Sequence, residues 1–286
     1  MCLIPIVYFA LLLIIGIAAG LVGSLSGLGG GVVIVPALTI LLGVPIEYAA
    51  GASLISTIAT SSGAASRYIK DGLSNIRIGM SLEIATTLGA VIGSLTAAYI
   101  YSIGLFQVIF IVFGIALLSS IVPTFIEYKK KRRNRINVDW TTSAFQLEGK
   151  YYDRASGRTI RYSGFRWWFG EAVMVIAGIA SGLLGIGSGV LKVIAMDWGM
   201  KLPMKVTTST SNFMIGVTAA AGSAIYWALG YIQPFLLAPI VLGVLAGSYY
   251  GANVLIKAKG SSIREFFLII LVIAGVEMIL RGFGVA

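Results

Sequence analysis

The feature that most constrains this chain is a series of long apolar stretches. They cover residues 4–22, 29–44, 48–69, 76–100 and 105–126, and after a polar central segment they continue at 169–184, 187–198, 205–228, 233–256 and 266–284. A helix needs ~20 residues to cross the hydrocarbon core of a bilayer. Apolar residues make up 58% of the chain, more than a soluble fold could bury while covering itself with polar groups. The sequence predicts an all-α polytopic membrane protein.

Basic residues are concentrated between two of these stretches. Eleven of the 21 Lys and Arg residues lie between Lys129 and Arg166, including the run Lys129–Arg133. A basic loop between apolar spans marks the cytoplasmic side, so the net charge of +10 reflects membrane topology rather than nucleic-acid binding. We therefore expect a multi-pass protein of the cell membrane, surrounded by lipid, with its central loop in the cytoplasm.

The central loop divides the chain into three parts. We expect a first transmembrane repeat at 1–126, a basic cytoplasmic linker at 127–168 and a second transmembrane repeat at 169–286. Within the linker, residues from Ala144 to Gly164 alternate in part and contain a Ser-Gly turn near Gly157. This pattern favours a small β-hairpin; the alternative is a solvated connector without fixed structure.

The two halves share one ungapped register. At an offset of 158 residues, Gly20 falls on Gly178 and Tyr68 falls on Tyr226. The same register aligns Gly27 with Gly185, Gly29 with Gly187, Gly31 with Gly189, Pro45 with Pro203, Ser53 with Ser211, Thr60 with Thr218 and Gly89 with Gly247. Because Pro and Tyr match as well as small residues, the register indicates an internal duplication.

The charges of equivalent turns indicate that the repeats are inverted. The turn at 70–77 carries Lys70 and Arg77, whereas its counterpart at 229–234 has no Lys or Arg. Conversely, the turn with Lys201 and Lys205 has a counterpart at 43–47 that contains no Lys or Arg. Since basic turns face the cytoplasm, we expect two inverted repeats of about five helical segments each. Secondary transporters often have this plan, with the solute site near the midplane.

Glycine clusters interrupt the helices at equivalent points of the two repeats. The sequences are SGLGGG at Ser26–Gly31 and GLLGIGSG at Gly182–Gly189, and they predict broken or re-entrant hairpins. Backbone N–H groups that open a helix suit an anion; the alternative role is close helix packing through small residues. The candidate substrate-binding residues in these clusters are Gly27, Gly29, Gly30, Gly31, Gly185, Gly187, Ser188 and Gly189.

A polar stripe follows the first glycine cluster. Ser53, Ser56 and Thr57 share one face of a helix, and Ser211 and Asn212 belong to the matching helix of the second half. Hydroxyl and amide groups can donate to an oxyanion without the desolvation cost of a fixed charge. The alternative is hydrogen bonding between helices or back to helix carbonyls.

Two ionisable residues lie within apolar stretches, where charge is costly and often functional. Glu83 could carry a coupling proton, or it could pair with Arg77 or with a nearby hydroxyl. Lys192 could attract an anion, or it could extend its ammonium group to the cytoplasmic surface, which we favour. Both are candidate coupling residues.

Catalytic patterns are missing from the sequence. It has no histidine and one cysteine, Cys2, and it contains neither a nucleophile–histidine arrangement nor a Walker motif. We therefore expect a protein that is not an enzyme and that has no catalytic residue, no metal site and no cofactor.

The glycine motifs resemble those of a known family. The segment GLVGSLSGLGGGVVIVPALTILLGVP, paired with GIASGLLGIGSGVLKV after the linker, is similar to the sulfite exporter TauE/SafE family of permeases. The resemblance implies proton-coupled transport of a small sulfur-containing anion such as sulfite, sulfonate, sulfoacetate or thiosulfate. Ser188 stands where the first motif has Gly30, which argues against a symmetric site. An anion channel and a non-catalytic membrane scaffold remain alternatives, and a homodimer is one possible assembly.

Overall fold

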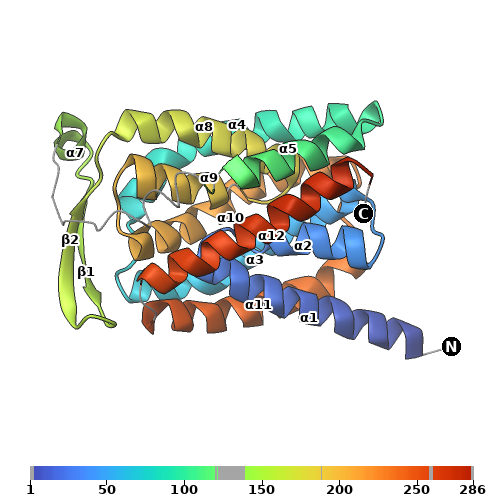
Figure 1. Ribbon diagram of the computed structural model, residues 1–286, viewed down its shortest axis with the longest axis horizontal. Coiled ribbons are helices and arrows are strands. Elements are labelled where there is room, and N and C mark those ends of the chain that lie inside the picture. Colours follow the sequence, from blue (N-terminus) through green and yellow to red (C-terminus); the bar gives the residue numbers. More distant parts are fainter. Residues whose placement is uncertain (1–2, 120, 122–138, 188, 258–259, 285–286) are drawn as a thin grey trace.

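The computed structural model describes residues 3–119, 121, 139–187, 189–257 and 260–284. The basic run Lys129–Arg133 and Ser188 lie outside the described residues. The chain forms a bundle of long helices that lie side by side, with a two-stranded sheet across one end of the bundle (Figure 1). We call this the hairpin end. The opposite end, where α1 begins, is the distal end (Figure 1).

The helices follow the apolar stretches closely. The first half contains α1 (Leu3–Ser26), α2 (Gly31–Pro36), a π-helix η1 (Ala37–Leu41), α3 (Ile46–Lys70), α4 (Ile76–Ser102) and α5 (Phe106–Ser119). The second half contains α8 (Trp167–Leu184), α9 (Gly189–Ile194), a π-helix η2 (Ala195–Gly199), α10 (Met204–Ala228), α11 (Pro234–Lys257) and α12 (Gly260–Gly282). The glycine clusters do interrupt the helices, because residues 27–30 separate α1 from α2 and 185–187 lie between α8 and α9.

The distribution of polarity is that of a membrane protein. Four helical segments of the described chain are long and apolar enough to cross a bilayer: Val7–Ser26, Ile76–Ser102, Trp167–Leu184 and Pro234–Lys257. Large apolar side chains such as Ile84 and Leu88 are exposed on the outside of α4, whereas the interior holds many buried hydroxyls. Helices α3 and α10 carry most of these hydroxyls and are buried along much of their length.

Equivalent helices of the two halves make equivalent contacts. Helix α1 packs along α11, and α8 packs along α4. A Cβ atom at Gly20 would collide with the carbonyl oxygen of Val244, and one at Gly178 would collide with that of Thr86. The two contacts are equivalent, because Gly178 is the counterpart of Gly20 at the 158-residue offset and Val244 is the counterpart of Thr86. Each half therefore packs its first helix against the other half, so the halves interlock.

The linker contains the predicted hairpin. Strand β1 (Glu148–Asp153) pairs antiparallel with β2 (Arg158–Ser163), with Glu148 opposite Ser163. The turn ends at Gly157, whose φ of 64° suits glycine. A short helix α7 (Trp140–Ala144) precedes the strands, and the Asp139 side chain caps it by accepting a hydrogen bond from the Thr142 N–H.

Candidate functional site

The two glycine loops cross in the interior of the bundle. A Cβ atom at Gly189 would collide with the carbonyl oxygen of Gly27 and with the Cα atom of Leu28. In the opposite sense, a Cβ atom at Gly31 would lie 2.8 Å from the Cα atom of Ile186. Only glycine allows such close backbone contact. The fold therefore brings together two motifs that lie far apart in the sequence.

Helix α3 faces this crossing with Thr57 and Ser53. Cβ atoms at Gly29 and Gly187 would lie 2.8 and 2.5 Å from the Thr57 methyl carbon, so Thr57 touches both loops. A Cβ atom at Gly31 would lie 2.5 Å from the Ser53 hydroxyl oxygen. Gly29 and Gly187 have φ values of 73° and 75°, in the left-handed region that favours glycine.

The other predicted loop glycines pack against neighbouring helices. Cβ atoms would lie 3.1 Å from the Thr208 Cα atom at Gly27, 3.2 Å from the Ala19 carbonyl oxygen at Gly30 and 2.6 Å from the Ala50 Cβ atom at Gly185. Thr208 and Ala50 are themselves related by the 158-residue offset. The loops thus serve close packing, as the packing alternative expected, whereas the role of their N–H groups in anion binding stays a prediction.

Six buried polar groups on α3, α8 and α10 have no hydrogen-bond partner among the described residues. They are the hydroxyls of Ser53, Thr57, Ser181, Thr207 and Thr208 and the amide oxygen of Asn212. All six side chains belong to residues that are 0% exposed. An unsatisfied buried polar group costs about 1–3 kcal/mol, and native proteins leave few of them. This cluster, which we call the hydroxyl cluster, is therefore the best candidate for a ligand site.

Other residues of the predicted stripe use their polar groups within the fold. The Ser56 hydroxyl donates to the carbonyl oxygen of Ala52, one turn back on α3, at 2.7 Å. The Ser211 hydroxyl donates to the Gly27 carbonyl oxygen at 2.7 Å, and the Asn212 amide donates to that of Ser24 at 2.9 Å. Ser211 thus holds the first glycine loop and Asn212 holds the end of α1 before it, while the Asn212 amide oxygen is left unpartnered among the described residues.

Three members of the hydroxyl cluster were not among the predicted site residues. Thr207 and Thr208 belong to a run of hydroxyl residues at the start of α10, which was visible in the sequence. Ser181 lies near the end of α8 in a stretch of small residues that gives no distinct signal. Burial without a partner singles out all three, and this property is visible only in the folded chain.

Glu83 and Lys192 form a buried ion pair. The Lys192 ammonium lies 3.2 Å from the Glu83 carboxylate, and the two side chains are 0% exposed for Lys192 and 6% exposed for Glu83. The Thr218 hydroxyl donates to Glu83 at 2.5 Å and accepts a hydrogen bond from Lys192. The expectation that Lys192 reaches the cytoplasmic surface was wrong, because a countercharge inside the bundle compensates the cost of burying the ammonium group.

The expected partners of Glu83 were only partly right. Arg77 does not pair with it and instead donates to the side chain of Gln146 in the linker at 2.7 Å. The hydroxyl partner is confirmed in Thr218, with a longer hydrogen bond from Thr87 at 3.4 Å. Lys192, 109 residues away in the sequence, was not considered as a partner.

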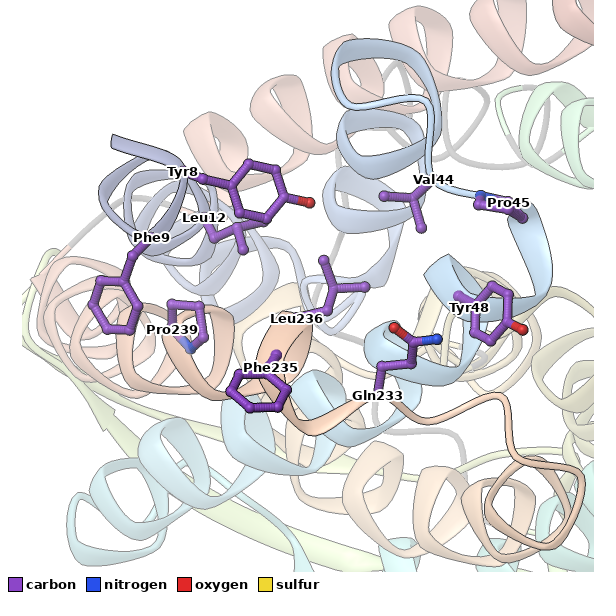
Figure 2. Close-up of a pocket in the computed structure, with 10 residues that line it drawn as sticks. All are labelled: Tyr8, Phe9, Leu12, Val44, Pro45, Tyr48, Gln233, Phe235, Leu236 and Pro239. Atoms are coloured by element: carbon purple, nitrogen blue, oxygen red, sulfur yellow. The ribbon is translucent and has the colours of Figure 1, made fainter. Parts of the chain in front are cut away.

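A pocket opens at the distal end of the bundle. It has a volume of about 530 Å³ and lies between the starts of α1, α3 and α11 (Figure 2). Its lining is mainly apolar and consists of Tyr8, Phe9, Leu12, Val44, Pro45, Tyr48, Gln233, Phe235, Leu236 and Pro239. Ser53 of the hydroxyl cluster follows Tyr48 by five residues on α3, which is about 7 Å along the helix axis. The sequence did not predict this pocket.

The chemistry of the candidate site is that of neutral hydrogen-bonding groups. No group of three His, Cys, Asp or Glu side chains that could hold a metal ion forms within the described part of the chain. The buried charges Glu83 and Lys192 lie on helices α4 and α9 and neutralise each other. The site can therefore offer a solute several hydrogen bonds and a neutral surrounding.

Comparison with known proteins gives consistent matches. The chain is 30% identical over 281 residues to "Probable membrane transporter protein YunE" of Bacillus subtilis, covering 96% of this chain and 98% of that protein. It is 25% identical to "Probable membrane transporter protein MJ0441" of Methanocaldococcus jannaschii, covering 94% and 95% of the two chains. No solved structure gives a significant match.

Residues 12–278 match the family described as "Sulfite exporter TauE/SafE". The matched region includes both glycine loops, the hydroxyl cluster and the Glu83–Lys192 pair, and it spans the linker between them. This chain belongs to the sulfite exporter TauE/SafE family.

Proposed function

We propose that this protein is a secondary transporter that moves a small sulfur-containing oxyanion, such as sulfite, a sulfonate, sulfoacetate or thiosulfate, across the cell membrane. The observation that carries the proposal is the hydroxyl cluster, which is buried without partners among the described residues and of which Ser53, Thr57 and Thr208 lie against the glycine loops. Family membership and the names of the relatives, which are described as probable membrane transporters, support a transport role.

The chemistry of the cluster favours an oxyanion. Its members include four hydroxyls on α3 and α10, from Ser53, Thr57, Thr207 and Thr208, each able to donate one hydrogen bond. An oxyanion offers several acceptor oxygens around a compact centre, so one solute could satisfy several of these donors. Because each unsatisfied group costs about 1–3 kcal/mol, bound solute would relieve part of that cost.

Alternating access would follow from the repeat architecture. We propose that the repeats at 1–126 and 169–286 are inverted about the membrane plane and that the hairpin end faces the cytoplasm. The paired contacts of α1 with α11 and of α8 with α4 support the repeat. The basic residues of the linker, together with Lys70, Arg77, Lys201 and Lys205, support the orientation. In inverted-repeat transporters, the site near the midplane is exposed alternately to the two sides.

We propose that Glu83 and Lys192 couple transport to protons. The buried pair is neutral overall, so it offers no spare positive charge to an anion. Protonation of Glu83 would leave the Lys192 ammonium uncompensated, and an entering anion would restore neutrality in the low-dielectric interior. One proton would then accompany each negative charge.

Transport by purified protein in lipid vesicles tests the proposal. The panel is sulfite, sulfoacetate, thiosulfate and a simple alkyl sulfonate, with chloride as a control, each with and without a pH gradient. We expect saturable uptake of at least one sulfur oxyanion that increases when protons flow in the same direction. Unsaturable conductance in planar bilayers would instead indicate a channel. No solute movement under any gradient would exclude the proposed transport function and favour a role as a membrane scaffold.

Glu83→Gln tests the coupling separately. We expect this variant to lose the response to the pH gradient, because position 83 can no longer exchange a proton. Retained pH-gradient dependence would exclude Glu83 as the proton carrier. It would not affect the assignment of the solute to the hydroxyl cluster, which is tested separately by substitutions at Ser53 and Thr57.

A further inference from the structure

The two ends of the bundle differ at equivalent positions. The distal pocket is lined by Phe9, Gln233 and Pro239, whose counterparts at the 158-residue offset are Trp167, Asn75 and Ser81. At the hairpin end these counterparts make direct contacts. The Trp167 indole donates to the Ser81 hydroxyl at 3.2 Å. The Asn75 amide donates to the Tyr162 hydroxyl of strand β2, also at 3.2 Å.

Side chains of the linker fill the space at the hairpin end. Phe145 stacks on Trp167 with ring centroids 4.4 Å apart. Leu147, Tyr151 and Tyr162 are buried and belong to the main hydrophobic core. A region that is an open pocket at the distal end is therefore packed by residues of the linker at the hairpin end.

Charged contacts fasten the hairpin to both halves of the molecule. Arg154 in the turn lies 2.6 Å from Asp71, which follows α3 in the first half. Asp153 at the end of β1 lies 2.7 Å from Lys205, at the start of α10 in the second half. Lys205 also donates to the Ile256 carbonyl oxygen near the end of α11. Adjacent hairpin residues thus tie together elements of both repeats.

We propose that residues 139–166 form a gate, here called the linker gate, that closes the hairpin end while the distal pocket is open. The proposal rests on the proposed alternating-access function. Opening at the hairpin end requires Phe145 and Tyr162 to leave the bundle and the Asp71–Arg154 and Asp153–Lys205 contacts to separate. The linker then has a role in the transport cycle beyond connecting the repeats.

A labelling experiment tests the gate without measuring transport. In a Cys2→Ser background, Ile78→Cys places a thiol at a buried position of the hairpin end, and Leu236→Cys places one at its counterpart in the distal pocket. Adding Arg154→Asp should speed labelling of the thiol at position 78 by a charged maleimide several-fold without speeding labelling at position 236. Adding Asp71→Arg as well, which exchanges the two charges, should restore slow labelling. Unchanged labelling at position 78 after Arg154→Asp would overturn the gate.

A reversible cross-link tests whether the gate must move during transport. Oxidation of an Asp71→Cys/Arg154→Cys variant should block transport, and reduction should restore it. The matched control is Glu148→Cys/Ser163→Cys, which joins directly opposed residues within the hairpin and should leave transport unchanged. Full transport by the cross-linked first variant would overturn the gate. Absence of transport in the parent protein would refute the proposed function, and the labelling experiment would still decide on the gate.

Discussion

Neighbouring hydroxyls on α3 have different tasks. The Ser53 and Thr57 hydroxyls are buried without partners among the described residues, whereas the Ser56 hydroxyl is bound to the Ala52 carbonyl of its own helix. The difference lies in their partners, because Ser53 and Thr57 lie against loop glycines whereas the Ser56 hydroxyl bonds back to its own helix. A stripe of similar residues therefore contains both solute-binding candidates and side chains that serve the helix itself.

The first prediction concerns these hydroxyls. Ser53→Ala and Thr57→Val should each raise the KM for the transported oxyanion about tenfold, since one lost hydrogen bond is worth ~1–1.5 kcal/mol. Thermal stability should not fall, because each change removes an unsatisfied buried group. Ser56→Ala is the matched control and should leave KM nearly unchanged. Equal effects of Ser53→Ala and Ser56→Ala on KM would exclude a special role for Ser53.

The second prediction concerns the buried ion pair. Lys192→Met leaves the Glu83 carboxylate buried without its countercharge and should destabilise the protein by ~3–5 kcal/mol. The double variant Glu83→Gln/Lys192→Met should recover most of this loss, because no isolated charge remains. Unfolding in detergent measures both variants, with Arg77→Met at an exposed position as the control. A double variant no more stable than Lys192→Met would show that the two residues are not energetically coupled.

At the scale of elements, the glycine loops are constrained by backbone and by contact. Gly29 and Gly187 need a left-handed backbone and also leave no room for a side chain beside Thr57. Gly104 has a similar φ of 74° but no atom within 4 Å of its missing side chain. Comparison of these positions separates backbone strain from steric contact.

The third prediction uses this comparison. Gly29→Leu and Gly187→Leu should abolish transport, whereas Gly104→Ala should cost only the left-handed backbone strain of ~1–2 kcal/mol. The contact at Gly187 is with the Thr57 methyl group, so Thr57→Ser should partly rescue the milder Gly187→Ala. Vesicle uptake and size-exclusion profiles measure activity and folding together. If both Leu variants transport solute normally, the loops are packing elements only.

Two carboxylates of the linker have lowered pKa values, and one of them, Asp153, contacts the helical bundle. Burial alone would raise the pKa of Asp139, but hydrogen bonds from Thr141, Thr142 and the Arg166 N–H outweigh it and lower the pKa to about 2. Burial likewise opposes ionisation of Asp153, yet the Lys205 ammonium and the Ser156 hydroxyl lower its pKa.

The fourth prediction follows from the sign of these shifts. A carboxyl whose pKa is lowered on folding contributes stability above its ordinary pKa of 3.8, and this contribution is lost as the pH falls towards 2. The linker should therefore stay docked between pH 5 and 8 and loosen only in acid. The accessibility of the thiol in the Ile78→Cys variant after brief exposure to each pH, with labelling at one common pH, measures this. Release of the linker between pH 5 and 8 would contradict the assignment.

At the scale of the whole molecule, the halves depend on each other. Their first and third long helices pack in crossed pairs, α1 with α11 and α8 with α4, through glycines that allow direct backbone contact. Neither half can bury these glycine faces alone.

The fifth prediction is that two pieces of the chain assemble. When the chain is opened between residues 127 and 138 and both pieces are co-expressed, they should co-purify, whereas each piece alone should aggregate or be degraded. Gly20→Leu in the first piece should prevent co-purification, because its side chain would meet the Val244 carbonyl. Gly104→Leu, at a position where no atom lies within 4 Å, is the control. A monodisperse single piece would show that the halves fold independently.

Much of this architecture could be predicted because membrane helices are determined locally. Hydropathy over ~20 residues locates a span, and glycine clusters locate its interruptions, so the helices and the linker hairpin agree with expectation. The polar stripe on one helix face also pointed to Ser53 and Thr57. Ser56 has the same residue type as Ser53 and was assigned to the same face, yet its hydroxyl bonds to its own helix, a distinction that periodicity cannot make.

Local sequence was sufficient for the membrane class, the helices with their glycine breaks, the 158-residue register and the family. Three features emerged only once the chain was folded: Lys192 pairs with Glu83, Thr57 touches both glycine loops, and the linker packs the hairpin end. The physical reason is that hydropathy and backbone preference act over a few residues of one segment. Pairing of buried charges and close backbone contact depend on which segments meet after the chain has reversed direction many times.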